Sequence, residues 1–227
     1  MSGESHSLEK PIWKLYEDEA YVVFDKPAGL LVIPTPKKEK NTLVHIVNFQ
    51  YAAKETPQLH PCHRLDRETS GAILFAKGKR HQQLMMSLFA KRGVQKKYIA
   101  FVHGRLSQPK GSFKSAVRDI DHNKFRKQAQ AKQALTHFKV IDERKSFSVV
   151  EVQPVTGRTN QIRIHFSKNK HPLVGDRKYA FARDYPLKFR RTALHALSLE
   201  WKHPIFHNNV KVVSNLPKDM EVFLERN

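Results

Sequence analysis

Charged and hydroxyl side chains crowd together in residues 63–71 (HRLDRETSG), directly before the apolar stretch 71–76. Polar groups at the mouth of a buried strand are typical of the rim of a site. The carboxylate of Asp66 is the group in this stretch that could attack or deprotonate a substrate. The alternative is structural: Asp66 caps a polar loop in which Thr69 and Ser70 form a turn.

A metal site is a second chemistry that this region suggests, because His60, Cys62 and His63 lie close together in the sequence. No second ligand pair follows at a zinc spacing, and Cys62 is the only cysteine. A thiolate-rich metal site and a disulfide framework are therefore not expected. The sequence also contains no Walker or dinucleotide-binding glycine motif. We expect neither a metal nor a cofactor.

Residues 63–71 resemble the HRLDxxTSG signature of the RluA-type family of RNA pseudouridine synthases. Further along, residues 156–165 (TGRTNQIRIH) resemble the family's TGRxHQIRxH segment, and residues 171–176 (HPLVGD) resemble its HPxxGD segment. Shorter matches occur in the family's order at residues 25–29 (DKPAG), 96–98 (KKY), 194–196 (LHA) and 203–204 (HP). The likeness thus extends from about Ile12 to near the carboxyl end.

The resemblance implies an isomerase that converts uridine in RNA to pseudouridine. In this reaction the N-glycosidic bond breaks, the base rotates, and C5 is joined to C1′. Asp66 matches the family's catalytic aspartate, and three roles stay open: attack on C1′, addition to the base, or abstraction of a sugar proton. All three need an ionised carboxylate, beside which the family places an arginine, here Arg163. Tyr98 matches the tyrosine that stacks on the target base and could move a proton.

The resemblance also assigns two residues to RNA binding. The target base must leave the RNA stack to reach Asp66. Arg64 matches the residue that fills the vacated space, a role suited to a flat cationic side chain. Leu194 matches an apolar wall against the extruded base, with an ordinary core leucine as the alternative. In one departure, Asn160 stands where the family usually has His; Asn can also donate and accept hydrogen bonds, so we expect activity to survive.

The charge of the chain indicates its partner. The 41 Lys and Arg residues exceed the 21 Asp and Glu residues, for a formal charge of +20. Such an excess favours a polyanion, RNA before an anionic membrane surface. Charge alone fits equally a basic RNA-binding or RNA-chaperone protein without chemistry, but the joint presence of Asp66, Tyr98 and Arg163 favours the enzyme. We expect a cytoplasmic monomer acting on structured RNA, either ribosomal or transfer RNA.

The pattern of apolar residues predicts the elements that position these groups. Strands are expected at residues 21–24, 71–76, 97–102, 134–140 and 147–152, the last two as a hairpin. Helices are expected from residue 42, over 79–91 with a core stripe, and over 159–168. Late strands or a short helix are expected at 194–201 and 210–213, and an irregular basic insertion that could touch RNA at 108–133.

These elements predict the α+β class, with a mixed, mainly antiparallel sheet flanked by helices and loops. Residues 1–11 are expected to form a flexible tail, and residues 12–227 a single catalytic domain. Ahead of Ile12 there is no room for the S4 RNA-binding domain that the family frequently carries. The chain is thus expected to be the catalytic domain alone.

Overall fold

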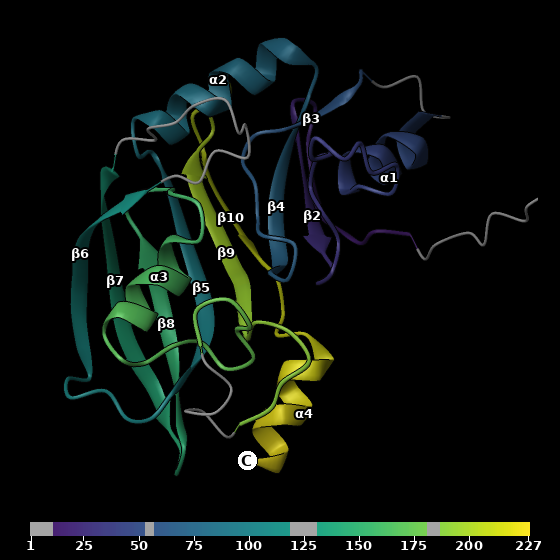
Figure 1. The fold of residues 1–227 in the computed structure, drawn as a ribbon. Coiled ribbons are helices and arrows are strands. Elements are labelled where there is room, and N and C mark those ends of the chain that lie inside the picture. The colour runs from purple at the N-terminus through teal and green to yellow at the C-terminus, as the bar shows by residue number, and fades with distance from the viewer. Residues whose placement is uncertain (1–10, 53–56, 119–130, 181–186) are drawn as a thin grey trace, which may run out of the picture.

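The computed structural model describes residues 11–52, 57–118, 131–180 and 187–227 (Figure 1). Within them a single 10-stranded sheet has the order β1-β2-β4-β9-β5-β8-β7-β6, with β10 paired to β9 and β3 to β4. Its strands are β1 (Lys14–Glu17), β2 (Tyr21–Lys26), β3 (Leu59–Pro61), β4 (Ser70–Lys77), β5 (Val94–His103), β6 (Lys110–Arg118), β7 (Ala131–Glu143), β8 (Phe147–Pro154), β9 (Leu194–Lys202) and β10 (Asn209–Val213).

The pairing between these strands is antiparallel except between β4 and β9, which are parallel. The described residues also form four helices: α1 (Leu43–Tyr51), α2 (Lys79–Ala90), α3 (Gln161–Lys168) and α4 (Lys218–Arg226). The prediction of a mixed, mainly antiparallel α+β fold is therefore confirmed.

The alternation of side chains along the strands divides the helices between the two faces of the sheet. Phe24 of β2 belongs to the core cluster that contains α1 and α3, whereas its neighbour Val23 packs in the cluster that contains Met85 of α2. On β5, Tyr98 likewise faces α3, and Phe101 faces α4. Helices α1 and α3 thus cover one face, and α2 and α4 the other.

Most of the elements predicted from the sequence are confirmed, and residues 194–201 and 210–213 prove to be strands. The prediction of an irregular insertion at 108–133 is wrong at both ends of that range, because β6 and β7 pair antiparallel there. Residues 119–130 lie outside the described part of the chain. Burial alternates along β6, with Lys110 and Lys114 exposed, but the small residues Gly111 and Ser115 occupy two of its partly buried positions, so its apolar pattern is weak.

Two helices differ from expectation. The predicted core stripe of α2 is too wide: Met85 is buried and Leu88 and Phe89 pack partly, but Leu84 is 40% exposed. Helix α2 therefore contacts the sheet through the narrower stripe of Met85, Leu88 and Phe89, at positions i, i+3 and i+4. Helix α4 was not predicted, although Met220 and Phe223 lie three residues apart and acidic residues occupy its first turn.

The parallel contact between β4 and β9 depends on Gly71, which pairs with Ala196. Gly71 has a φ of +110°, and a Cβ on it would lie 2.3 Å from the carbonyl oxygen of Ala196. The backbones approach so closely because no side chain separates them. The glycine that ends the HRLDRETSG segment therefore joins the loop of Asp66 to the strand of Leu194.

Gly71→Ala should lower the free energy of unfolding by about 3 kcal/mol or more, since it combines backbone strain with a steric clash. Gly29→Ala is the matched control: its φ is +86°, but nothing lies within 4 Å of an added Cβ, so only strain of about 1 kcal/mol is expected. Urea unfolding of both variants measures the difference. If both variants lose the same free energy of unfolding, the close approach of Gly71 to Ala196 does not contribute to the loss.

Candidate active site

A cavity of about 470 Å³ opens where the loop between β3 and β4, strand β5 and the start of α3 meet. All five site residues predicted from the sequence line it, although they come from four separate parts of the chain. They are Arg64, Asp66, Tyr98, Arg163 and Leu194. The fold thus brings the predicted residues to one place.

The backbone around Asp66 is held by the loop that follows β2. The buried ammonium of Lys26 donates to the carbonyl of Arg67 at 3.1 Å, and the Gly29 amide donates to the same carbonyl at 2.8 Å. The Arg67 side chain returns a hydrogen bond to the Gly29 carbonyl at 2.9 Å. Burial lowers the pKa of Lys26 to about 7. The DKPAG segment therefore holds the backbone of the loop that carries Asp66.

Arg191, in the segment before β9, is a second contact to the same loop and links it to the carboxyl-terminal helix α4. The guanidinium of Arg191 donates to the carbonyl of Glu68 and to the hydroxyl of Ser70, both at 3.2 Å. It also makes two hydrogen bonds to Asp219 of α4, at 2.7 and 3.0 Å. The ring of His195 contacts the Ser70 hydroxyl at 3.0 Å. The loop of Asp66 is therefore fixed on both sides.

Arg163 of α3 is the cation beside Asp66. Its Nε and Nη2 donate to the two carboxylate oxygens of Asp176 at 2.7 and 2.9 Å, and its Nη1 donates to the Asn160 side-chain oxygen at 2.7 Å. The same Nη1 lies 3.7 Å from Oδ2 of Asp66. At that distance the two groups form an ion pair but not a hydrogen bond. The arginine is thus clamped by Asp176 and presents its remaining edge to Asp66.

Asn160, the departure from the family pattern, takes part in this clamp. It precedes α3 with φ 54° and ψ 22°, in the left-handed region that Asn tolerates better than most residues. Its side-chain oxygen accepts from Arg163, as described above. In this chain Asn160 therefore contacts the arginine directly.

The two carboxylates beside Arg163 differ in their affinity for protons. Burial raises the pKa of Asp66, and the positive charges of Arg163 and Arg64 oppose this shift without cancelling it. At Asp176 burial acts in the same direction, but the hydrogen bonds and charge of Arg163 prevail and lower the pKa. Asp176 therefore serves as the permanent counter-ion of Arg163, and Asp66 is the group that can accept a proton.

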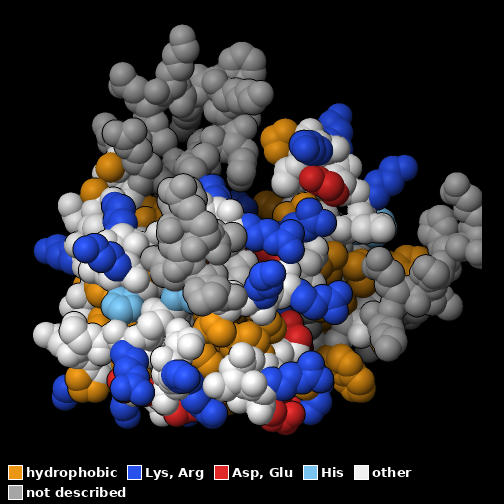
Figure 2. Space-filling model, turned by 60° about the horizontal axis from the view of Figure 1, so that its bottom comes forward, with side chains coloured by type: hydrophobic (Ala, Val, Ile, Leu, Met, Phe, Trp, Pro, Cys, Tyr) orange, Lys and Arg blue, Asp and Glu red, His pale blue; other side chains and the backbone are white. Residues whose placement is uncertain are grey.

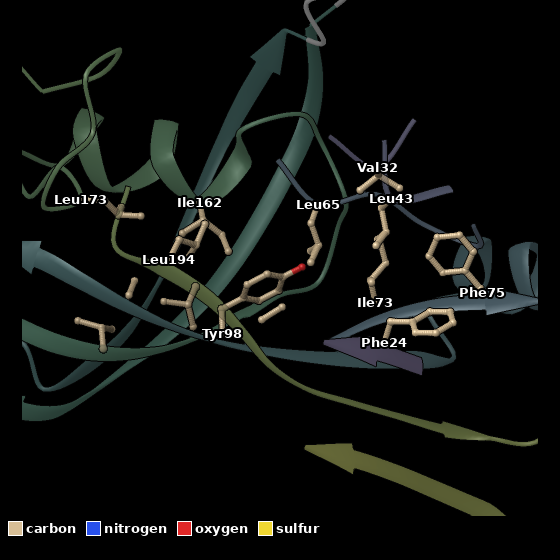
Figure 3. Packing of buried hydrophobic residues seen from close by; sticks show 14 of the residues in the cluster. Phe24, Val32, Leu43, Leu65, Ile73, Phe75, Tyr98, Ile162, Leu173 and Leu194 are labelled. Atoms are coloured by element: carbon tan, nitrogen blue, oxygen red, sulfur yellow. The ribbon is translucent and has the colours of Figure 1, made fainter. Parts of the chain in front are cut away.

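Tyr98 and Leu194 form the apolar side of the cavity. Burial, helped by the negative charge of Asp66, raises the pKa of Tyr98, so its phenol stays neutral. Figure 3 shows the Tyr98 ring with its hydroxyl directed toward Leu65, and Ile162 and Leu194 on the other side. Leu194 is 4% exposed and belongs to a core cluster, so it fits both the core role and the wall role weighed from the sequence.

The residues that suggested a metal have other partners. Nε2 of His63 accepts a hydrogen bond from the Leu74 amide at 3.0 Å, and burial lowers the pKa of this imidazole to about 3. Burial raises the pKa of the Cys62 thiol to about 12. In the described part of the chain, no three His, Cys, Asp or Glu residues are grouped so that they could hold a metal ion. His63 and Cys62 line the cavity as uncharged groups.

Comparison with known proteins agrees with this geometry. The sequence profile of the family described as RNA pseudouridylate synthase matches residues 20–168. The chain belongs to this family. The family resemblance drawn from the motifs is therefore confirmed, as is the assignment to enzymes of the isomerase class. Within the described residues, no helix has the length and apolar character that crossing a membrane requires.

The relatives of this chain carry names of RNA pseudouridine synthases. It is 34% identical over 212 residues to "Uncharacterized RNA pseudouridine synthase YhcT" of Bacillus subtilis (strain 168), an alignment that covers 91% of this chain and 69% of that protein. It is 32% identical over 224 residues to "Ribosomal large subunit pseudouridine synthase D" of Xylella fastidiosa (strain Temecula1 / ATCC 700964), with 92% and 67% covered. Among solved structures, "Human RNA Pseudouridylate Synthase Domain Containing 4" superposes with a TM-score of 0.79 at 27% identity, with 97% of this chain and 94% of that chain covered.

Three residues of the site were not singled out from the sequence. Asp176 was quoted within the HPLVGD segment without a role, and that segment was the signal that could have found it. Lys96 and Arg158 also line the cavity. Both stand in segments that resemble the family, but spacing alone does not show that they face the same space as Asp66.

The raised pKa of Asp66 has a consequence for stability. A carboxyl whose pKa is higher in the folded than in the unfolded protein destabilises the fold when it is ionised, and this cost disappears as the pH falls through the raised pKa. Asp66→Asn should therefore raise the Tm by a few degrees at pH 7.5, and the gain should shrink as the pH approaches 4. Thermal unfolding across this pH range measures the effect.

The matched control is Asp142→Asn, which removes a carboxylate on the surface that pairs with Arg144. It should leave the Tm nearly unchanged, because exposed ion pairs contribute little. A loss of stability in Asp66→Asn at pH 7.5 would mean that the ion pair with Arg163 outweighs the burial of the carboxylate.

Proposed function

We propose that this protein isomerises uridine to pseudouridine within RNA, and that the carboxylate of Asp66 carries the reaction. The observation that supports this most is the position of Asp66 in the cavity, 3.7 Å from an arginine that Asp176 holds in place. A carboxylate in a partly dry site stays reactive only if a fixed cation limits the cost of its charge. Arg163 meets that requirement.

The chemistry needs no external reactant. The bond between C1′ and N1 of the uracil breaks, the base turns within the cavity, and C5 forms a new bond to C1′. The proton on C5 is then lost and N1 gains one, so that atoms and charge balance. Attack of Asp66 on C1′, its addition to the base and abstraction of a sugar proton are all compatible with this outcome, and each begins from the ionised carboxylate.

The other predicted residues have roles that suit their surroundings. Tyr98, neutral and buried beside Asp66, would stack on the uracil and could move a proton in the last step. Leu194 would pack against the other side of the base. Arg64 is exposed at the cavity rim, where its guanidinium would fill the space that the extruded base leaves in the RNA.

The substrate we propose is structured RNA, with ribosomal RNA before transfer RNA. The net charge of +20 favours a long polyanion. On the face seen in Figure 2, many Lys and Arg side chains and few Asp and Glu side chains are visible. Ribosomal RNA comes first because several relatives are named as synthases of the large ribosomal subunit.

The test uses ribosomal and transfer RNA carrying tritium at C5 of uridine, because each turnover releases that label to water. The wild-type protein should release label and form pseudouridine in at least one of the two RNA classes. Asp66→Asn should reduce the rate by about 10⁴-fold or more, the scale expected when the group that carries the chemistry is removed. Asp142→Asn, a surface carboxylate, should keep the wild-type rate.

Two outcomes would contradict the proposal. Equal release by wild-type protein and Asp66→Asn would remove Asp66 from the chemistry. If the wild-type protein binds both RNAs but releases no label from either, the protein is instead the non-catalytic RNA-binding protein or RNA chaperone considered from the sequence.

A further inference from the structure

Two cations of the cavity lack the partners that the other buried cations have. Lys26 donates to three carbonyl groups, Arg163 is held by Asp176, and Arg191 is held by Asp219. In contrast, the Nε of Arg158 is buried and has no hydrogen-bond partner among the described residues. The ammonium of Lys96 likewise has no hydrogen bond or ion pair within the part of the chain that the structure describes.

Lys96 and Arg158 both lie at Gly157, Lys96 beside it in space and Arg158 next to it in the chain. Lys96 is on β5, two residues before Tyr98, and its Nζ is 3.6 Å from the position that a Cβ on Gly157 would take. Arg158 follows Gly157 directly, in the turn that leads to α3, and both cations line the cavity of Asp66. The absence of a side chain at Gly157 leaves the space above the Lys96 ammonium open.

An unpaired cation in a half-buried site costs free energy unless an anion completes it. Burial lowers the pKa of Lys96, and no carboxylate acts against this shift. The nearby imidazole of His63 accepts a hydrogen bond from the Leu74 amide and supplies no negative charge. The described residues therefore leave this site without an anion of their own, and an external anion would complete it.

We propose that Lys96 and Arg158 form a binding site for a phosphate of the RNA backbone, next to the uridine that enters the cavity. The inference rests on the proposed function for the identity of the anion. An ammonium beside an open glycine and the guanidinium of the next residue, both lining one cavity, suit a phosphodiester, which offers several acceptor oxygens and one negative charge. This contact would fix the backbone of the RNA while the base occupies the space beside Asp66 and Tyr98.

The test measures binding without turnover. A fluorescein-labelled single strand of 15 uridine nucleotides is titrated with protein at several salt concentrations, and the slope of log Kd against log salt is determined. Each phosphate neutralised in a single strand contributes about 0.7 to this slope. The double variant Lys96→Met/Arg158→Met should lower the slope by at least about 0.7 and raise Kd about tenfold. Circular dichroism verifies that the variants are folded.

Two further variants distinguish the loss of this phosphate site from a general loss of positive charge. Lys96→Arg keeps the charge and should keep the slope, whereas Lys211→Met removes an exposed lysine of β10, outside the cavity, and should leave slope and Kd close to wild type. If the double variant gives the same slope as Lys211→Met, the phosphate site is refuted.

The result is independent of catalysis. If the wild-type protein forms no pseudouridine but the double variant lowers the slope, the phosphate site stands and the proposed function fails. If the wild-type protein is active and the double variant keeps the wild-type slope, the proposed function stands and the phosphate site fails.

Discussion

The arrangement of the site depends on the guanidinium of Arg163, because it lies between two carboxylates. It forms hydrogen bonds with one of them and only a longer ion pair with the other. Asp176 takes Nε and Nη2 through two hydrogen bonds, which fixes the plane of the arginine. Nη1 is shared between Asn160 and the longer ion pair to Asp66. Asp66 therefore receives enough positive charge to limit the cost of ionisation but keeps its oxygens free of a tight partner. A carboxylate bound as firmly as Asp176 would be a poor nucleophile or base.

The sheet delivers this geometry from distant parts of the sequence. In the order β4-β9-β5-β8, the loop before β4 carries Asp66, β9 begins with Leu194, β5 contributes Tyr98, and the chain leaves β8 for the helix of Arg163. Gly71 allows β4 and β9 to approach as parallel neighbours. Lys26 and Arg191 then hold the loop of Asp66 from two sides. The positions of the residues that line the cavity are thus set in part by contacts to the backbone of the Asp66 loop.

The sequence predicted what depends on local patterns and could not predict what depends on long-range contacts. Alternating or continuous apolar runs predicted most central strands, and the ordered motifs predicted five residues that line one cavity. The edge strand β6 was missed because Gly111 and Ser115 interrupt its apolar face. The burial of Lys26 was missed because its carbonyl partners come from two separate loops. The motifs contained Asp66, Asp176 and Arg163, but only the fold shows that Asp176, and not Asp66, holds the arginine by hydrogen bonds.

The most direct test of the different roles of Asp66 and Asp176 is to titrate Asp66 itself. The titration is monitored by carbon NMR of protein labelled at the aspartate carboxyl groups, and Asp66→Asn assigns the signal. Asp66 should titrate above the ordinary aspartate value of 3.8 in the wild-type protein, because burial outweighs the neighbouring charges. In Arg163→Gln its titration should move higher still, because the opposing positive charge is gone. An Asp66 signal that titrates at or below the ordinary value, or that does not respond to Arg163→Gln, would contradict the account.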